Sequence, residues 1–209
     1  MNDPGVIILF AMKTLSLFYS RPAGLGLVLG LLFSGAFLQA APETYKIDPV
    51  HSSVDFKIRH LGISWVSGIF KEFEGTLIYD ETNAAASTIE VMVKASSVDT
   101  NSEMRDAHLK KPEFFNVDKF PALTFKSTKV EKLPSGHLKV NGDFTLLGVT
   151  KPIEFEVEVS GPVQGMKGET RRGGETEFEI KRSDYGMKEM VGPIGDEAKI
   201  SLAFSAIKQ

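Results

Sequence analysis

Cysteine is absent from this chain of 209 residues, and tryptophan occurs only once. Without cysteine the protein has no disulfide, no thiolate ligand for a metal ion and no cysteine-linked lipoprotein anchor. The absence is compatible with an oxidising compartment but is no proof of one, because many exported domains use no disulfides. Cysteine chemistry is therefore excluded, whereas the compartment must be inferred from other features.

A large excess of charge is also absent. The 24 basic and 27 acidic residues give a net charge of −3, which becomes −4 once Asp3, Lys13 and Arg21 are removed with the first forty residues. Such mild acidity leaves no electrostatic footprint for nucleic acid or for an anionic membrane surface, so we expect no nucleic-acid partner. Repeats, low-complexity tracts and interdomain linkers are lacking as well, which indicates one domain after residue 40.

Motifs for catalysis and metal binding are missing too. His51 and His60 would point to opposite faces of one continuous strand, so they cannot share a metal ion without a bulge between them. His60 continues an apolar face, where a histidine more often satisfies a buried hydrogen bond. No G-x-S-x-G elbow surrounds His51-Ser52, which disfavours a hydrolase. We expect no metal, no cofactor and no catalytic residue.

The first forty residues have the composition of a secretory signal. Lys13 and Arg21 supply a basic start, residues 24–38 form an apolar run, and Ala40-Ala41 is a small-residue exit. The run is short for a membrane span, which needs about 20 residues. We therefore predict a signal peptide over residues 1–40, with Met12 as an alternative start, and a periplasmic protein with no stable membrane span after cleavage. An uncleaved N-terminal anchor is the alternative.

Alternating side chains dominate the rest of the chain. Between His51 and His60, Val54, Phe56 and Ile58 share one face, which predicts a strand with one dry and one wet face. The same period recurs over residues 73–80, 88–94, 123–126, 138–146, 153–160, 177–181 and 199–204. Residues 102–110 change to a helical pattern with Ser102 as a plausible N-cap. Residues 161–174 are glycine-rich and basic, which indicates a loop.

These segments predict an all-β fold of eight antiparallel strands with one short helical insertion. Closing the sheet into a barrel removes both exposed edges, so we expect an eight-stranded barrel, with a two-sheet sandwich as the alternative. Such an interior is either filled or able to hold one small ligand. Fifteen phenylalanines against four tyrosines suit a wide, dry interior, although an ordinary phenylalanine-rich core fits them equally well. Strands of about 8–10 residues give a barrel roughly 20–25 Å tall.

Several short motifs occur in a fixed order along residues 45–207. They read YKIDPVHS at 45–52, FKIRHLG at 56–62, RDAHL at 105–109, GDFTLLGVTKP at 142–152 and RSDYGM at 182–187. Together they resemble the YceI-like family of exported, lipocalin-like barrels that bind polyisoprenoids. Phe144 and Leu147 depart from it, replacing a leucine and a commonly basic residue. The resemblance implies a lipocalin-like barrel over residues 41–209, an elongated apolar channel and no established enzymatic activity.

The candidate ligand-binding residues share the apolar phase of their strands or of the insertion. On the strands they are Val54, Phe56, Ile58, His60, Leu77, Val91, Phe125, Leu138, Phe144, Phe155, Val157, Phe178, Leu202 and Phe204. In the insertion, Met104, Leu109, Phe114 and Phe115 are candidates for a lid or channel wall. Asp106 and His108 are expected to hold the insertion against the barrel. Residues 182–184 are interpreted as a local surface ion pair and an Asx turn, with a polar contact to a ligand head group as the alternative.

These features support the hypothesis that the protein binds or carries a polyisoprenoid lipid such as a quinone or a polyprenyl phosphate. Each buried methylene contributes about 0.8 kcal/mol and one net hydrogen bond about 1 kcal/mol, so the tail should dominate the affinity. Other long-chain lipids such as fatty acids or amides are alternative ligands. A filled barrel that acts through its surface in a stress response, and an enzyme acting on the bound lipid, are alternative functions. A homodimer is left open.

Overall fold

A computed structural model describes residues 41–209, so the expected signal peptide at residues 1–40 and the alternative start at Met12 lie outside the described residues. The described chain forms one antiparallel sheet with a single α-helix, α1 (Glu103–Leu109). The strands are β1 (Glu43–Ile47), β2 (Ser53–His60), β3 (Ser64–Phe70), β4 (Phe73–Tyr79), β5 (Thr88–Lys94), β6 (Val98–Asp99), β7 (Ala122–Lys132), β8 (Leu138–Leu146), β9 (Val149–Gln164), β10 (Thr170–Lys181) and β11 (Ile194–Lys208). Short 3-10 turns are η1 (Pro49–His51), η2 (Ala84–Ala86), η3 (Ala95–Ser97) and η4 (Arg182–Tyr185). Over residues 41–209, no helix has the length and apolar character needed to cross a membrane.

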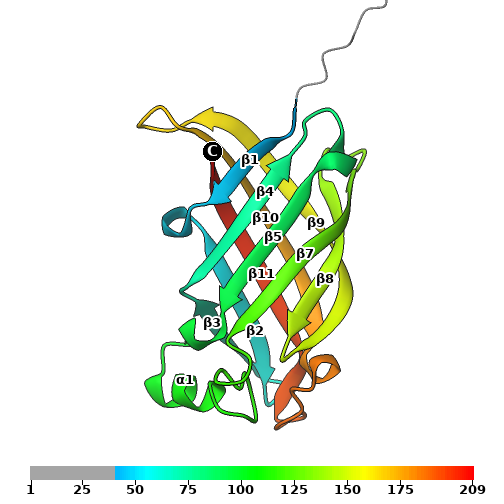
Figure 1. Cartoon of the computed structure of the whole chain (residues 1–209). Helices are drawn as coiled ribbons and strands as arrows, with labels where there is room; N and C mark the ends of the chain where they lie inside the picture. The colour runs from blue at the N-terminus through cyan, green and yellow to red at the C-terminus, as the bar shows by residue number, and fades with distance from the viewer. Residues whose placement is uncertain (1–40) are drawn as a thin grey trace, which may run out of the picture. The chain divides into compact units, whose positions relative to one another are not determined.

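The sheet closes on itself through its first and last strands. In order, β1, β4, β5, β7, β8, β9, β10 and β11 are neighbours, and β11 pairs with β1 again, with Tyr45 opposite Lys208. These eight positions form the closed ring seen in Figure 1. The expected eight-stranded antiparallel barrel is therefore confirmed, together with its short helical insertion.

A kink divides the first position of the barrel into two strands. Pro49 has no backbone N–H for a ladder, and the Asp48 carboxylate accepts a hydrogen bond from the Val50 N–H, which fixes the 3-10 turn η1. Before η1, β1 pairs with β4, and after it, β2 pairs with β3. Both β1 and β2 also pair with β11. The expectation that His51 belongs to one strand with His60 is therefore wrong, because His51 lies in η1.

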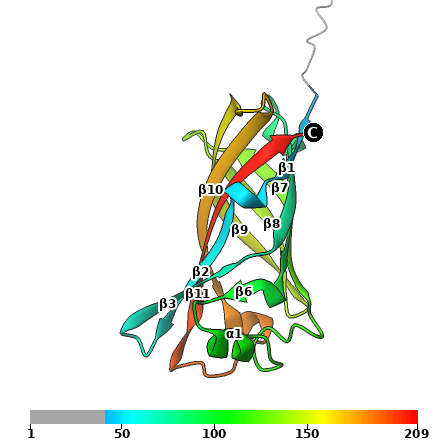
Figure 2. The same ribbon diagram turned by 90° about the vertical axis from the view of Figure 1, so that its left-hand side faces the viewer.

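The β2–β3 hairpin leaves the barrel at the end that carries α1. Beyond β2, β3 pairs only with the two residues of β6, so Figure 2 shows the hairpin extending past the barrel wall. β3 itself was not among the predicted strands, because Gly62 and Gly68 interrupt the alternation that indicates a strand. We call this end of the barrel the α1 end.

The last three strands are longer than their patterns indicate. β9 spans 16 residues and β10 begins at Thr170, so the predicted loop over residues 161–174 is wrong: only residues 165–169 connect the two strands. Glycine at 174 reads as a strand breaker, but a Cβ there would lie 2.7 Å from the Phe204 ring, so it provides space instead. At about 3.3 Å per residue and a tilt near 40°, β9 rises up to about 40 Å, well above the height expected from the sequence.

The barrel is filled at the end opposite α1. Tyr45, Leu138, Val130 and Val140 are the largest fully buried side chains, and they belong to one apolar cluster. A second cluster, which includes Phe70, Val98, Phe114 and Tyr185, lies toward α1. The open part of the interior therefore has to lie on the α1 side of the Tyr45 cluster.

Candidate functional site

Two adjoining cavities occupy the interior between α1 and the filled end. The first has a volume of about 830 Å³ and reaches from α1 into the barrel. The second is about 120 Å³ and lies deeper. Both cavities are lined by Phe56, Phe70, Leu123, Phe144 and Ile200, which form a neck between them.

The neck is built by residues that lie opposite one another on neighbouring strands and whose side chains point into the barrel. Ile200 of β11 lies opposite Phe56 of β2 on one side and Phe178 of β10 on the other. The Phe56 ring lies 5.6 Å from the Phe70 ring, centroid to centroid. Since opposed side chains on one face of an antiparallel pair are in contact, alternation along the sequence becomes a continuous apolar wall.

The structure brings almost all of the predicted ligand-binding residues to these cavities. The first is lined by Ile58, His60, Met104, Leu109, Phe114 and Phe115. The second is lined by Val54, Leu77, Val91, Phe125, Phe155, Val157, Phe178, Leu202 and Phe204, and Phe56 and Phe144 line both. Leu138 is the exception and corrects the prediction, because it is packed in the filled end. That these residues contact a ligand remains a prediction.

The helical insertion forms one wall of the first cavity. The Asp106 carboxylate accepts hydrogen bonds from the backbone N–H of Thr100 at 2.9 Å and from its hydroxyl, so Asp106 ties α1 to the segment that follows β6. The His108 and Phe114 rings meet nearly at right angles, 4.9 Å between centroids. This contact of His108 lies within the insertion, so that His108 holds the insertion against the barrel stays a prediction. Phe115 packs edge-on against Phe70, so the insertion reaches the neck. Ser102 occupies the N-cap, but its side chain makes no capping hydrogen bond.

Arg182 corrects the expectation of a surface ion pair. Its guanidinium lines the first cavity, is 3% exposed and donates to four backbone carbonyls, those of Met187, Glu189, Ile194 and Gly195. Burial lowers its pKa from the ordinary value, but each carbonyl dipole stabilises the cation. With four carbonyl partners, Arg182 shapes the β10–β11 connection.

The ionisable side chains around the first cavity are all basic. They are Arg59, His60, Arg105, His108, Lys111 and Arg182, and within residues 41–209 no aspartate or glutamate lines this cavity. His60 contradicts the expected buried hydrogen bond: its side chain is exposed and makes none to the described residues, because the hairpin leaves the barrel there. His108 pairs with Glu113 at 3.2 Å. The open side of the cavity therefore has a basic rim.

Some lining residues were not predicted. Most lie where glycine or a turn hides the alternation, namely Val66 and Phe70 on β3, and Met187, Met190, Ile194 and Ala198 around the start of β11. Leu123, Leu146, Ile180 and Ile200 also line this cavity, and they lie in predicted strands on the apolar phase. The alternation could have found these four residues, whereas those on β3 and around the start of β11 depend on the course of the chain beyond the predicted strands.

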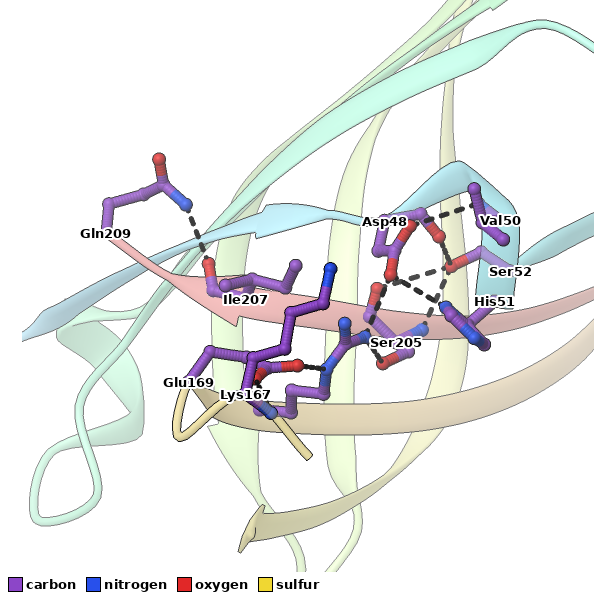
Figure 3. Close-up of polar contacts among 10 residues, drawn as sticks. Asp48, Val50, His51, Ser52, Lys167, Glu169, Ser205, Ile207 and Gln209 are labelled. Carbon is purple, nitrogen blue, oxygen red and sulfur yellow. Dashed lines mark hydrogen bonds and ion pairs between the residues drawn. The ribbon is translucent and has the colours of Figure 1, made fainter. Parts of the chain in front are cut away.

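A polar cluster lies at the η1 kink, next to the second cavity, which Ser52 lines. Figure 3 shows the Asp48 carboxylate accepting from His51 Nδ1, and it also accepts from the Arg171 guanidinium, both at 2.8 Å. Arg171 foremost, and then His51, hold the pKa of Asp48 at about 2. The Ser52 hydroxyl donates to backbone carbonyls of Asp48 and Ser205, so it is not aligned with His51 as a nucleophile. Within residues 41–209, no group of three or more metal-ligating side chains is arranged around one point.

Comparison with known proteins adds sequence and fold relationships. Residues 45–206 match the model of the YceI-like domain. Protein YceI of Shigella flexneri is 40% identical over 187 residues, which cover 87% of this chain and 97% of that protein. The crystal structure of BcnA from Burkholderia cenocepacia superposes with a TM-score of 0.69 at 20% identity, covering 76% of this chain and 98% of that one. A polyisoprenoid-binding domain from Saccharophagus degradans, implicated in plant cell wall breakdown, superposes with a TM-score of 0.63 at 14% identity, covering 79% and 98%.

Proposed function

The chain belongs to the YceI-like family, and from this premise we propose that it binds and carries a polyisoprenoid lipid inside its barrel. The observation that carries the proposal is the pair of adjoining cavities, about 830 and 120 Å³, behind walls of phenylalanine and aliphatic side chains. Such a space suits a long, apolar tail better than a polar metabolite. The ligand named for the S. degradans domain agrees with this class of lipid.

The energetics favour recognition of the tail over the head group. Each methylene buried in the cavity contributes about 0.8 kcal/mol, so two or three isoprene units outweigh one net hydrogen bond of about 1 kcal/mol. The basic rim leaves room for an anionic or polar head group at the α1 end. A quinone, a polyprenyl phosphate, a fatty acid and a fatty amide all satisfy these conditions, and we favour the isoprenoids because of the family relationship.

Binding rather than catalysis is the activity that we propose. Around the first cavity, Arg182 donates to backbone carbonyls and His108 pairs with Glu113, so these groups have structural partners of their own. Chemistry on a lipid needs converging acid, base or nucleophilic groups near its reacting atom. We also propose export to the periplasm, which rests on the signal-like residues 1–40 alone.

Mass spectrometry of lipid extracted from the purified protein tests the proposal. We expect an isoprenoid to co-purify with the parent protein. Phe56→Trp at the neck and Phe155→Trp in the second cavity should expel it while the barrel still folds, because each enlarges an aromatic ring into ligand space. Val163→Trp, on an exposed side chain near the β9–β10 turn, is the matched control and should retain lipid.

Two results would contradict the lipid carrier. One is a parent protein without lipid even after expression with abundant isoprenoid, and the other is unchanged lipid in both cavity variants. A further observation would point to the filled barrel acting through its surface: Phe155→Ala costing about 3–5 kcal/mol of unfolding free energy, as in a solid core. A phenylalanine facing a lipid should be shortened at a smaller cost.

A further inference from the structure

Large apolar side chains are exposed on two neighbouring loops at the α1 end. In the β2–β3 turn, Leu61 is 57% exposed and Ile63 is 81% exposed. The connection to β11 exposes Met190 and Val191. The Leu61 N–H donates to the Pro193 carbonyl at 2.7 Å, so the two loops are held together. Scattered single apolar residues are common on protein surfaces, but a group of four on two joined loops indicates a binding surface.

The only tryptophan of the chain lies beside this group. Trp65 is on the outer face of β3, two residues from Ile63, and is 38% exposed. The Arg59 guanidinium lies 4.1 Å from its ring centroid, and the Lys57 and Lys199 ammonium groups lie within 6 Å. An amphipathic indole ringed by cations is the arrangement found where proteins meet the head groups of a bilayer.

The positive charge of this surface comes from the hairpin itself. Lys199 pairs with Glu179, whereas Lys57 and Arg59 form no ion pair with the carboxylates of residues 41–209. On α1, acidic and basic side chains alternate, so the helix adds little net charge. The net charge of the chain does not reveal this surface, because Lys57 and Arg59 lie together on one hairpin, whereas acidic residues such as Glu154, Glu156 and Glu158 lie on another strand, β9.

The same hairpin borders the first cavity. Arg59 and His60 at the end of β2 line it, and so do Met190 of the adjoining loop and Met104 of α1. Met104 is among the most exposed large side chains of the described chain, and Figure 2 shows α1 and the hairpin at the same end of the barrel. Exposed apolar groups, an aromatic ring, cations and the rim of the cavity therefore coincide at this end.

We propose that the β2–β3 hairpin and the loop carrying Met190 and Val191 form a docking surface for the face of an anionic lipid bilayer. Leu61 and Ile63 enter the boundary of the acyl chains, Trp65 lies at the level of the head groups, and Lys57 and Arg59 contact lipid phosphates. Docking in this way presents the basic rim of the first cavity to the membrane. The inference goes beyond lipid carriage, since docking does not depend on which lipid occupies the barrel.

Vesicle binding tests this surface directly. The protein is purified from the exported fraction, and intact mass establishes its N-terminus. It is then mixed with vesicles of phosphatidylcholine alone or with about one-third phosphatidylglycerol. We expect co-sedimentation and a blue shift of Trp65 emission with the anionic vesicles, and weaker binding at high salt. Equal binding to neutral vesicles, or emission that does not move, would overturn the proposal.

Matched variants separate the apolar and the charged contributions. Leu61→Asn with Ile63→Ser should weaken binding about ten-fold or more, and asparagine tolerates the positive φ of 52° at position 61. Lys57→Gln and Arg59→Gln should each weaken it roughly five-fold. Val163→Ser with Met166→Ser removes two exposed apolar side chains at the β9–β10 connection and should leave binding unchanged. Equal binding by the Leu61/Ile63 variant and this control would contradict the proposal.

Two further measurements on the same variants distinguish the alternatives. Co-purifying lipid should persist in the Leu61/Ile63 variant, so loss of vesicle binding with lipid retained reports on docking alone. A parent protein that binds anionic vesicles but carries no lipid would refute the proposed function and leave the docking surface intact. Sedimentation velocity completes the test. If the parent is a dimer, the Leu61/Ile63 variant is a monomer and both bind vesicles equally, the surface contacts a second copy of the chain, and our inference is overturned.

Discussion

At the scale of single residues, Asp48 joins the η1 kink to the neighbouring strands. Its carboxylate accepts hydrogen bonds from Arg171 of β10 and from His51, and Arg171 also reaches the Ser205 hydroxyl of β11. Three segments that are remote in the sequence are therefore fixed around one negative charge. Because the charged form has these partners only in the folded protein, its pKa lies at about 2 instead of 3.8.

This pKa shift predicts an acid-dependent part of the stability. A carboxyl group whose pKa is lowered in the folded state stabilises that state at any pH above the pKa of the group in the unfolded chain. This contribution disappears as the pH falls through about 2. Asp48→Asn should therefore unfold at lower urea concentration than the parent near neutral pH, and the difference should vanish as the pH approaches 2. Urea midpoints across this range measure it, with the exposed Asp118→Asn as control. A difference that persists undiminished at the lowest pH would show that Asp48 acts through something other than its charge.

Arg182 predicts a second effect at this scale. Lysine at 182 keeps the positive charge but replaces the planar fork with three donors on one nitrogen, so it cannot reach all four carbonyls of the β10–β11 connection. We expect Arg182→Lys to lower the unfolding free energy by about 2 kcal/mol or more. Chemical denaturation measures the loss, and Lys181→Arg at the exposed neighbouring position is the control. A cost no larger than that of the control would contradict the buried role of the guanidinium.

At the scale of elements, the contact between β2 and β3 contributes to the width of the neck. Gly68 lies directly opposite Phe56, and a Cβ at 68 would be 2.4 Å from the tip of the Phe56 ring and 2.8 Å from the Thr100 methyl group. The Phe56 ring lines both cavities, so it can yield by turning toward them. The glycine therefore controls how much of the neck the phenylalanine fills.

Gly68→Ala should consequently narrow the neck. We expect a loss of about 1–3 kcal/mol in unfolding free energy, as for overpacked interiors, and less co-purifying lipid per protein. The double variant Gly68→Ala with Phe56→Leu restores the space and should recover both quantities. Thermal or urea unfolding and lipid extraction measure them. If the leucine fails to rescue either quantity, the contact between Gly68 and Phe56 does not set the neck.

Elements also show what the sequence predicts well and where it fails. Alternation predicted the inward phase of the barrel strands, and the seven residues of α1 were found from a change of period. The start of β10 was missed because Gly174, which makes room for the Phe204 ring, looks like a glycine that ends a strand. The Asp48-Pro49 pair indicated a turn, but His51 was placed on the strand after it, whereas the turn η1 extends through His51.

The candidate site follows the same pattern. Side chains such as Phe56 and Phe155 were assigned correctly to the interior, since strand phase alone decides it. Leu138 was misplaced along the barrel axis, because phase does not tell which level of the interior is filled. Arg182 was taken for a surface residue, because its burial depends on a connection that folds back over it.

At the scale of the whole molecule, the interior is filled at one end and has an open cavity at the other. Tyr45, Leu138 and Val140 fill the closed end, and the first cavity lies beside α1. A long tail that enters from the α1 end can therefore advance only to the second cavity. Any further length has to fold back or remain outside.

This geometry predicts a plateau in affinity. For prenyl alcohols of increasing length, each added isoprene unit should strengthen binding until the two cavities are filled, because each buried methylene contributes up to about 0.8 kcal/mol. Units beyond that length should add almost nothing. Competition against a fluorescent lipid measures the series. Affinity that continues to rise to the longest alcohol would mean that the filled end opens.

The pairing of β1 with β11 has a consequence for how the molecule forms. Tyr45 lies opposite Lys208, so the ring closes between residues near the two ends of the described chain. Contacts of such long sequence separation are slow to form, because most of the chain must be ordered before they do. A chain still bound to the ribosome would present two unpaired strand edges until β11 is available for pairing. Chaperone protection during this interval, rather than the stability of the finished barrel, would then limit the yield of the protein.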